Sequence, residues 1–152
     1  MTYSQDCYDL AAISEGMKTA AYRDPVGIWT IGYGHTGPEV VEGLVWTPEQ
    51  CMLQLGADLQ IACEQMERIV AVRLTQGQTD ALTDFTFNMG IGRLHDSTLL
   101  KRLNQGEYSS VPYELYHVDP DGTQHGWVFA GGVVLPGLVT RRLAEIDLWL
   151  KV

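Results

Sequence analysis

One continuous stretch, residues 14–36, constrains this chain more than any other part of the sequence. It reads SEGMKTAAYRDPVGIWTIGYGHT and carries two carboxylates, Glu15 before a glycine and Asp24 before a proline. Glu15 stands at the end of a helical pattern, and Asp24 opens a turn into an alternating run that contains Thr30. Glycosidic hydrolysis requires an acid and a base that flank the scissile bond, although Asp-Pro turns and helix-end glutamates are also typical of solvated surfaces.

The fixed positions of this stretch form a longer pattern, E-G-x(5)-Y-x-D-x-x-G-x-x-T-I-G-x-G-H. They are filled here by Glu15, Gly16, Tyr22, Asp24, Gly27, Thr30, Ile31, Gly32, Gly34 and His35. The pattern resembles the signature of phage-type lysozymes, glycoside hydrolase family 24. The likeness continues through LTQGQTDALTDFTFNMGIG (74–92), STLLKRLNQGEY (97–108) and AGGVVLPGLVTRRLAE (130–145), so it covers nearly the whole chain.

The resemblance implies an endolysin with muramidase activity that lyses the host cell. Such an enzyme hydrolyses the β-1,4 bond between N-acetylmuramic acid and N-acetylglucosamine in peptidoglycan, and the family is generally regarded as inverting. By the same resemblance Glu15 is the general acid, and Asp24 is the base that orients or deprotonates water. Thr30 would share that water through its hydroxyl. Glu15 must hold its proton near neutral pH, which requires partial burial or an apolar wall.

Further residues are expected to support this site. His35 is assigned a structural role in the framework of the small lobe, and Asn88 either contacts the substrate or caps a helix. Within the last helix, Arg141 and Arg142 are both candidates for an ion pair with Glu15, and the sequence does not decide between them. Such a pair would favour ionised Glu15, against its role as an acid, and would have to loosen when substrate binds.

Other functions remain open at this stage. A lytic transglycosylase would also use Glu15 but would form a 1,6-anhydro product, and the presence of both Asp24 and Thr30 argues against it. A peptidoglycan-binding module without catalysis would be expected to lack one of these three residues. An antibacterial toxin or a virion-associated muramidase would share the chemistry and differ in biology.

Composition limits the partners. The 152 residues carry a formal net charge of -9, with a pI near 4.7, which argues against nucleic acid because phosphate binding needs clustered Lys and Arg. The resemblance implies peptidoglycan glycan strands as the partner, and we expect a monomer and no cofactor. Residues 116–127 depart from the family pattern and predict an inserted loop or hairpin near the cleft. Their histidines and aspartates match no standard metal-ligand spacing, so no metal site is expected.

The termini and cysteines bear on location. The N-terminus MTYSQDCYDL is acidic and lacks the apolar segment of a secretory signal, and no stretch is apolar enough to span a membrane. Cys51 and Cys63 lie on one expected helix about 18 Å apart, too far for a disulfide, so the thiols are expected to be buried and free. These features predict residence in the host bacterial cytoplasm until a holin releases the enzyme to the periplasm and cell wall, without stable membrane insertion.

The fold expected is α+β and mainly α, a lysozyme-like fold with a small β-hairpin lobe and a larger helical lobe. Residues 4–15 predict a helix that Gly16 ends, and residues 22–34 predict twisted β structure. Capping boxes that begin at Thr47 and Thr75 predict a long joining helix over 48–69 and a second helix to Met89, which Gly90 and Gly92 end. Ser97 caps another helix, and a last one covers 138–150. The single catalytic domain would comprise a small lobe, 14–60, and a helical lobe, 61–152 with 4–15, and no separate wall-binding domain.

Overall fold

The computed structural model describes residues 1–151 and is mainly helical, with short antiparallel strands. This confirms the expected α+β class. The elements run in the order α1 (Gln5–Glu15), β1 (Lys18–Arg23), β2 (Trp29–Gly32), β3 (His35–Thr36), α2 (Pro48–Glu67), α3 (Gln76–Met89), α4 (Ile91–His95), α5 (Thr98–Asn104), α6 (Ser110–Leu115), β4 (Tyr116–Val118), β5 (Gln124–Gly126), β6 (Phe129–Ala130), β7 (Val133–Val134) and α7 (Pro136–Trp149).

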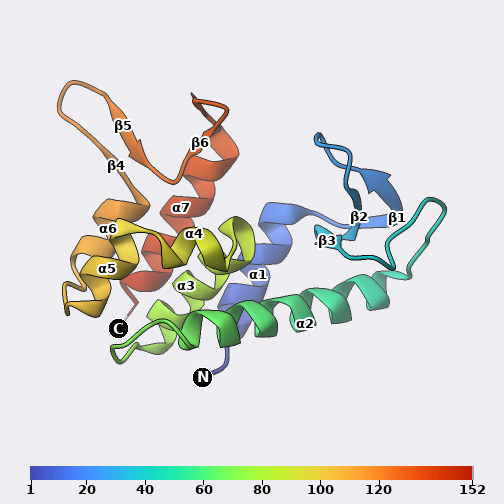
Figure 1. The fold of residues 1–152 in the computed structure, drawn as a ribbon, viewed down its shortest axis with the longest axis horizontal. Coiled ribbons are helices and arrows are strands. Elements are labelled where there is room, and N and C mark those ends of the chain that lie inside the picture. Colours follow the sequence, from blue (N-terminus) through green and yellow to red (C-terminus); the bar gives the residue numbers. More distant parts are fainter. Residues whose placement is uncertain (152) are drawn as a thin grey trace.

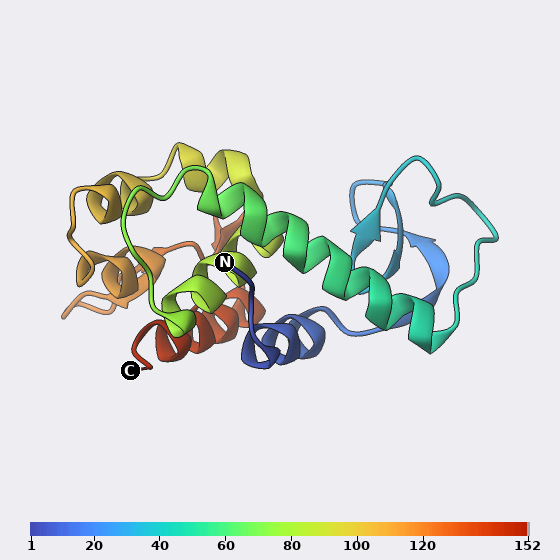
Figure 2. The ribbon, with the colours of Figure 1, turned by 90° about the horizontal axis from the view of Figure 1, so that it is seen from below.

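The small sheet and the helices gather at opposite ends of α2. Figure 1 shows β1, β2 and β3 beside one end of α2, with the remaining helices around its other end. Figure 2, seen from below, shows α2 running between the two groups, with α1 and α7 along the same side of the helical part. This is the small β lobe, long helix and larger helical lobe that the sequence predicts.

The long helix α2 begins where the sequence expects it and ends slightly earlier. Thr47 and Gln50 form both hydrogen bonds of a capping box, and Pro48 occupies the first helical turn. One face is buried, through Leu55, Leu59, Ala62, Cys63 and Met66. Met52 is 41% exposed and lies outside this buried face.

The helical core forms around α3, which packs against both α2 and α7. Thr75 and Gln78 form the second expected capping box, and Gly90 ends the helix with φ of 88°. Glycine at Gly77 permits the close approach of α7, because a Cβ there would lie 2.2 Å from the carbonyl oxygen of Leu148. The buried apolar core of this part comprises Cys63, Met66, Ala81, Leu82, Phe85, Leu94, Leu99, Leu100, Leu103, Val111, Leu115, Leu148 and Trp149.

The sheet of the small lobe is a three-stranded antiparallel meander in the order β1-β2-β3. Tyr22 lies opposite Thr30, and Ile31 lies opposite His35. The first strand, β1, begins at Lys18, four residues before the expected β structure. Within β1, Ala20 also forms an isolated antiparallel bridge with Val45. Local alternation of residues does not show these backbone pairings.

The second half of the chain contains the corrections to the expected elements. Gly92 lies inside the short helix α4 rather than ending α3, and α7 begins at Pro136, two residues before the expected start. Residues 116–127 contain a β-hairpin, β4–β5, which confirms one of the two forms expected for the insertion. The pair β6–β7 was not anticipated, because each strand has only two residues.

The three cysteines agree with the expectation about thiols. Cys7, Cys51 and Cys63 are buried and free. Burial raises the pKa of all three thiols, most strongly for Cys7, so they are poor nucleophiles near neutral pH. Over residues 1–151, no helix combines the length and apolarity needed to cross a membrane.

Candidate active site

Glu15 is the last residue of α1 and points toward α7. Gly16 ends the helix with a positive φ of 70°, so Glu15 projects from an ordered element. One carboxylate oxygen, Oε1, accepts a hydrogen bond from Nη1 of Arg141. The Glu15 side chain is 25% exposed and that of Arg141 is 5% exposed. The carboxylate therefore stands at the boundary between solvent and a buried cation.

Asp84 on α3 holds that cation from the other side. Its carboxylate accepts bonds from Nε and Nη2 of Arg141 at 2.8 and 2.9 Å, and its side chain is fully buried. Burial alone would lower the pKa of Arg141, but the hydrogen bonds and charges of Asp84 and Glu15 raise it above its ordinary value. The guanidinium of Arg141 thus lies between the carboxylates of Glu15 and Asp84. It donates two of its three hydrogen bonds to Asp84 and one to Glu15.

Gly34 brings the small lobe against Glu15. Its φ is +80°, and a Cβ at this position would lie 3.2 Å from Oε2 of Glu15. Only glycine combines this left-handed backbone with room for the carboxylate. Gly34 is thus the signature glycine whose backbone approaches Glu15.

Asp24 is fixed by the turn between β1 and β2. Its Oδ1 accepts hydrogen bonds from the backbone N–H groups of Val26 at 3.0 Å and Ile28 at 2.8 Å. The N–H of Gly27 donates to the Asp24 carbonyl at 2.9 Å and closes the turn. Asp24 is partly buried. With Oδ1 committed to the turn, Oδ2 is the oxygen that can accept a bond from a water or a substrate.

Thr30 is tied to the same turn through Ile28. The Thr30 hydroxyl donates to the carbonyl of Ile28 at 3.0 Å, while the N–H of Ile28 donates to Asp24. Thr30 is 4% exposed. Because the hydroxyl hydrogen is used, its oxygen can only accept a further bond, and a water placed there must donate to it.

The phenol of Tyr22 is affected by the charges of both Glu15 and Asp24. It lies opposite Thr30 in the sheet. Burial raises the pKa of the Tyr22 phenol, and the negative charges of Glu15 and Asp24 raise it further. The phenol therefore lies within the field of both carboxylates. The sequence places Tyr22 in the signature without assigning it a function.

His35 is held between two carboxylates, those of Asp58 and Glu39. Its Nδ1 lies 2.7 Å from Oδ2 of Asp58 and its Nε2 lies 2.6 Å from Oε1 of Glu39. Burial would lower the pKa of His35, but these bonds and charges raise it above its ordinary value. Both ring nitrogens are engaged within the protein. This geometry favours the structural role over proton transfer to a substrate.

Arg142, unlike its neighbour, faces away from Glu15. Its Nη2 donates to Oδ1 of Asn88 at 2.8 Å and to Oε1 of Glu145 at 2.6 Å, and its side chain is fully buried. Burial raises the pKa of Glu145 well above its ordinary range and lowers that of Arg142. The question that the sequence left open is answered in favour of Arg141. Asn88 is fixed by Arg142 and does not cap the helix.

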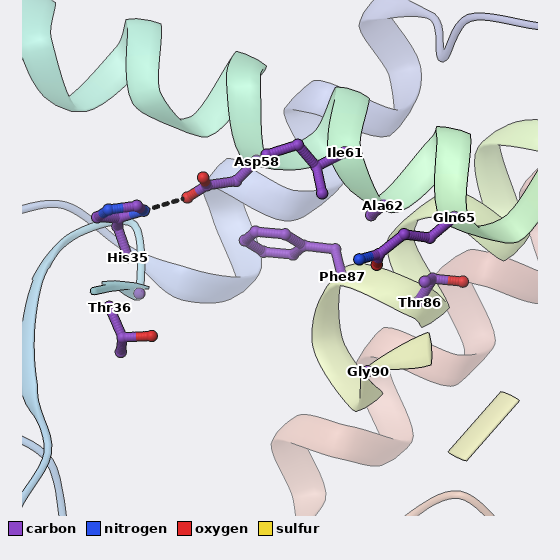
Figure 3. A pocket seen from close by; sticks show the side chains of 10 residues that line it. His35, Thr36, Asp58, Ile61, Ala62, Gln65, Thr86, Phe87 and Gly90 are labelled. Atoms are coloured by element: carbon purple, nitrogen blue, oxygen red, sulfur yellow. Dashed lines mark hydrogen bonds and ion pairs between the residues drawn. The ribbon is translucent and has the colours of Figure 1, made fainter. Parts of the chain in front are cut away.

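One hollow is lined by Glu15, and a second is lined by Gly34, the residue that approaches the Glu15 carboxylate. One of about 460 Å³ is lined by Ser14, Glu15, Asn88, Leu135, Pro136, Gly137, Leu138 and Arg141. The other, about 410 Å³, lies between β3, α2 and α3; Figure 3 shows Phe87 at its centre, with His35 and Asp58 at one side. Gly34 lines the second hollow and approaches Glu15, which lines the first.

Sequence reasoning missed Asp84 and could not choose between Arg141 and Arg142, because these residues meet through long-range contacts. Asp84 lies 57 residues from Arg141, and Arg141 lies 126 residues from Glu15. Asp84 occurs in a helix whose other residues are mostly apolar or uncharged, and a buried charge at that position was the available signal.

Comparisons with known proteins agree with this geometry. The family model described as phage lysozyme matches residues 12–145. The SAR-endolysin of Bacteriophage PS119 is 34% identical over 139 residues, covering 90% of this chain and 78% of that protein. The muramidase domain of SpmX from Asticaccaulis excentricus superposes with a TM-score of 0.82 at 32% identity, covering 99% of both chains. A mutant of P22 lysozyme superposes with a TM-score of 0.79 at 31% identity, again covering 99% of both. The chain belongs to the phage lysozyme family.

Proposed function

We propose that the chain cleaves the β-1,4 bond between N-acetylmuramic acid and N-acetylglucosamine, with Glu15 as general acid and Asp24 as general base. Membership of the family makes it a peptidoglycan-hydrolysing endolysin of the muramidase type. The observation that carries the assignment is the position of Glu15, which is partly exposed, lines a hollow and is backed by a buried ion pair. This arrangement gives a single carboxylate access to a bound glycan.

The proposed reaction has two proton transfers. Protonated Glu15 gives its proton to the glycosidic oxygen as the bond to the anomeric carbon breaks. A water molecule donates hydrogen bonds to Oδ2 of Asp24 and to the hydroxyl oxygen of Thr30. This water attacks the anomeric carbon, and Asp24 takes the proton that the water loses. The water enters opposite the leaving group, so the configuration inverts. The fixed turn that orients Asp24 supports its role, because a base must be held in place before the reaction.

Arg141 changes partners in this scheme. When Glu15 carries its proton, the attraction between its carboxyl group and the guanidinium weakens, while Asp84 keeps Arg141 in place through two hydrogen bonds. After proton transfer, the newly ionised Glu15 regains the contact with Arg141. Asn88 stands in the same hollow as Glu15 and is oriented by Arg142, so its amide is the proposed contact for a sugar substituent.

The biological setting is part of the same proposal. The enzyme would act as a monomer on peptidoglycan strands in the periplasm after a holin releases it from the host cytoplasm. The relative from Bacteriophage PS119 is named a SAR-endolysin, which supports an endolysin role for this chain.

Analysis of the product ends tests the function. Purified protein is incubated with peptidoglycan, and the released fragments are analysed by mass spectrometry and, at early times, by NMR for anomeric configuration. Hydrolysis with inversion predicts reducing N-acetylmuramic acid ends formed first as the α-anomer. Fragments that end in 1,6-anhydro sugars would instead establish a lytic transglycosylase, and β-anomers would establish retention.

Asp24→Asn tests the base within the same assay, and Asp121→Asn is its matched control. Asp121 also accepts a backbone N–H within a turn, from Thr123 at 2.9 Å, but it lies in the β4–β5 hairpin. Loss of a general base predicts a fall in turnover of about 10²–10⁴-fold for Asp24→Asn. Asp121→Asn should retain normal turnover. Equal activity of the two variants would remove Asp24 from the mechanism.

A further inference from the structure

The inserted hairpin β4–β5 brings three metal-ligating side chains together. His117 lies directly opposite His125 in the antiparallel pair, and Asp119 follows His117 by two residues. Side chains two apart on a strand, and those directly opposite across a pair, share one face of the sheet. Figure 1 shows this hairpin projecting from the helical part, away from β1–β3. The hairpin register therefore gathers ligands whose spacing along the sequence, H-x-D-x(5)-H, fits no standard motif.

The ligand atoms converge on one point. Nε2 of His125 lies 2.8 Å from Oδ2 of Asp119, and Nε2 of His117 lies 3.7 Å from Oδ1 of the same carboxylate. One ligand atom from each residue lies within 4.8 Å of the other two. The two imidazole rings are nearly parallel, with centroids 4.7 Å apart and an interplanar angle of 11°. Both rings thus present Nε2 toward one carboxylate.

Tyr113 fixes His117 in the form that binds metal. The Tyr113 carbonyl lies 2.8 Å from Nδ1 of His117, and because a carbonyl only accepts, Nδ1 carries the hydrogen. The neutral ring then has its lone pair on Nε2, the atom that faces Asp119. The Tyr113 ring also stacks on the imidazole, with centroids 3.6 Å apart. A backbone carbonyl that holds the remote N–H is the usual support of a metal-bound histidine.

We propose that His117, Asp119 and His125 bind a divalent transition metal ion, with Zn²⁺ as the reference ion. Two imidazoles and one carboxylate suit Zn²⁺, Cu²⁺ or Ni²⁺, whereas Mg²⁺ and Ca²⁺ prefer oxygen ligands. In the structure Nε2 of His125 donates a hydrogen bond to Asp119, so a metal ion would replace that proton. Zinc–ligand bonds of about 2.0–2.2 Å then require a small movement of the hairpin that separates this pair slightly and brings His117 closer. Three protein ligands leave a fourth position for water. The side chains are 20%, 43% and 44% exposed in sequence order, so an ion can reach them.

The function of the site follows from its position. It joins both strands of an exposed hairpin and includes no residue that contacts Glu15, Asp24 or Arg141. Bound metal should therefore stabilise the hairpin and raise the melting temperature without changing turnover. This inference is independent of the proposed reaction. It also departs from the expectation, drawn from the sequence, that the chain has no metal site.

Calorimetric titration of the whole, tag-free protein with ZnCl₂ tests the proposal. We expect one Zn²⁺ per chain, no binding of MgCl₂ at the same concentrations, and at least tenfold weaker Zn²⁺ binding in His117→Gln and His125→Gln. His95→Gln is the matched control, because His95 also lies 2.8 Å from a carboxylate, Asp96, but in a two-residue pair. This control should bind Zn²⁺ like the unchanged protein.

A second measurement uses the unchanged protein, so it tests the site even if a variant folds poorly. Long-range ¹H–¹⁵N NMR of the unchanged protein should show the Nε2 resonances of His117 and His125 shifting on addition of one equivalent of Zn²⁺, while those of His35 and His95 stay in place. Absence of stoichiometric Zn²⁺ binding would overturn the proposal. So would binding that persists undiminished in both hairpin variants, or shifts confined to the other two histidines.

Discussion

At the scale of single residues, the site depends on how one arginine is shared. Arg141 is nearly buried and serves both Glu15 and Asp84. A buried cation with only one carboxylate beside it would attract that carboxylate strongly, and an acid catalyst would be held in its ionised form. Asp84 takes two hydrogen bonds of the guanidinium and is itself fully buried. Of the two carboxylates that contact Arg141, Glu15 is therefore the one that is open to solvent.

Gly34→Ala tests the contact between the two lobes at Glu15. The variant places a methyl group 3.2 Å from Oε2 of Glu15 and forces alanine into a φ of +80°. We expect a loss of about 1–2 kcal/mol of unfolding free energy from the backbone and a clear loss of lytic activity from displacement of Glu15. Urea unfolding and turnover on peptidoglycan measure the two effects.

Gly43→Ala separates backbone strain from contact with Glu15. Gly43 has almost the same φ, +82°, but a Cβ there would meet no atom within 4 Å. Gly43→Ala should therefore lose about as much unfolding free energy as Gly34→Ala but keep normal lytic activity. If both variants keep activity, the approach of Gly34 to Glu15 has no catalytic consequence.

His35→Asn should destabilise the protein in a pH-dependent way. Because the pKa of His35 is raised on folding, its ion pairs with Asp58 and Glu39 contribute fully below the unfolded pKa of about 6.5. That contribution is lost as the pH rises through the higher folded pKa. We expect a loss of about 1–2 kcal/mol near pH 5.5 and a smaller loss near pH 9, since solvent partly screens this group. Denaturant unfolding at the two pH values measures the difference.

His95→Gln is the control for that measurement. The pair His95–Asp96 is highly exposed, with side chains 67% and 83% accessible, so its removal should change stability little at either pH. A loss for His35→Asn that is larger at high pH would contradict the assigned direction of its pKa.

The sequence predicted residues whose chemistry is local and left open those whose chemistry is long-range. Asp24 and Thr30 are joined through the backbone of Ile28, within a single turn, so a short pattern suffices to find them. Arg141 and Asp84 meet only because α3 packs on α7. No local pattern encodes that packing, which is why the choice between Arg141 and Arg142 required the structure.

At the scale of elements, cap chemistry was the strongest signal. The capping boxes at Thr47 and Thr75 marked the starts of α2 and α3 correctly, because both hydrogen bonds of each box involve residues only three apart. Elements of two to six residues, such as β6, β7, α4 and α6, were missed. Short elements satisfy few of their own hydrogen bonds and are set by tertiary contacts instead.

Gly77→Ala tests the packing of α3 against α7, on which Asp84 and Arg141 depend. A Cβ at Gly77 would lie 2.2 Å from the Leu148 carbonyl oxygen, which is backbone and cannot rotate away. We expect a loss of about 1–3 kcal/mol, by the same mechanism as overpacking of a core. Thermal or urea unfolding measures it.

Gly137→Ala is the matched control, because Gly137 is likewise the second residue of its helix, α7. A Cβ at Gly137 would meet no atom within 4 Å, and alanine has the higher helix propensity. Stability should therefore stay the same or rise slightly. Equal stability of Gly77→Ala and Gly137→Ala would contradict the close contact between the helices.

At the scale of the whole molecule, the net charge of -9 governs the encounter with an anionic wall. Arg141 and Arg142 are buried and paired with carboxylates, so they add little positive field outside, and Arg23, beside Asp24, is the exposed arginine of the turn that holds the proposed base. Repulsion weakens as the Debye length falls from about 30 Å at 0.01 M salt to about 10 Å at 0.1 M. Lysis of permeabilised Gram-negative cells should rise with salt over this range. A monotonic fall, with the protein still folded, would show that a local positive field dominates.

The assignment of Glu15 is tested most directly by the turnover of Glu15→Gln on purified peptidoglycan, measured as new reducing ends. The amide has nearly the same shape as the carboxyl group and cannot donate the proton, so we expect turnover to fall by about 10²–10⁴-fold while circular dichroism and melting stay those of a folded protein. Glu64→Gln, an exposed glutamate of α2, should retain normal turnover. Near-normal turnover in folded Glu15→Gln would contradict the account, because the account assigns the protonation of the leaving oxygen to Glu15.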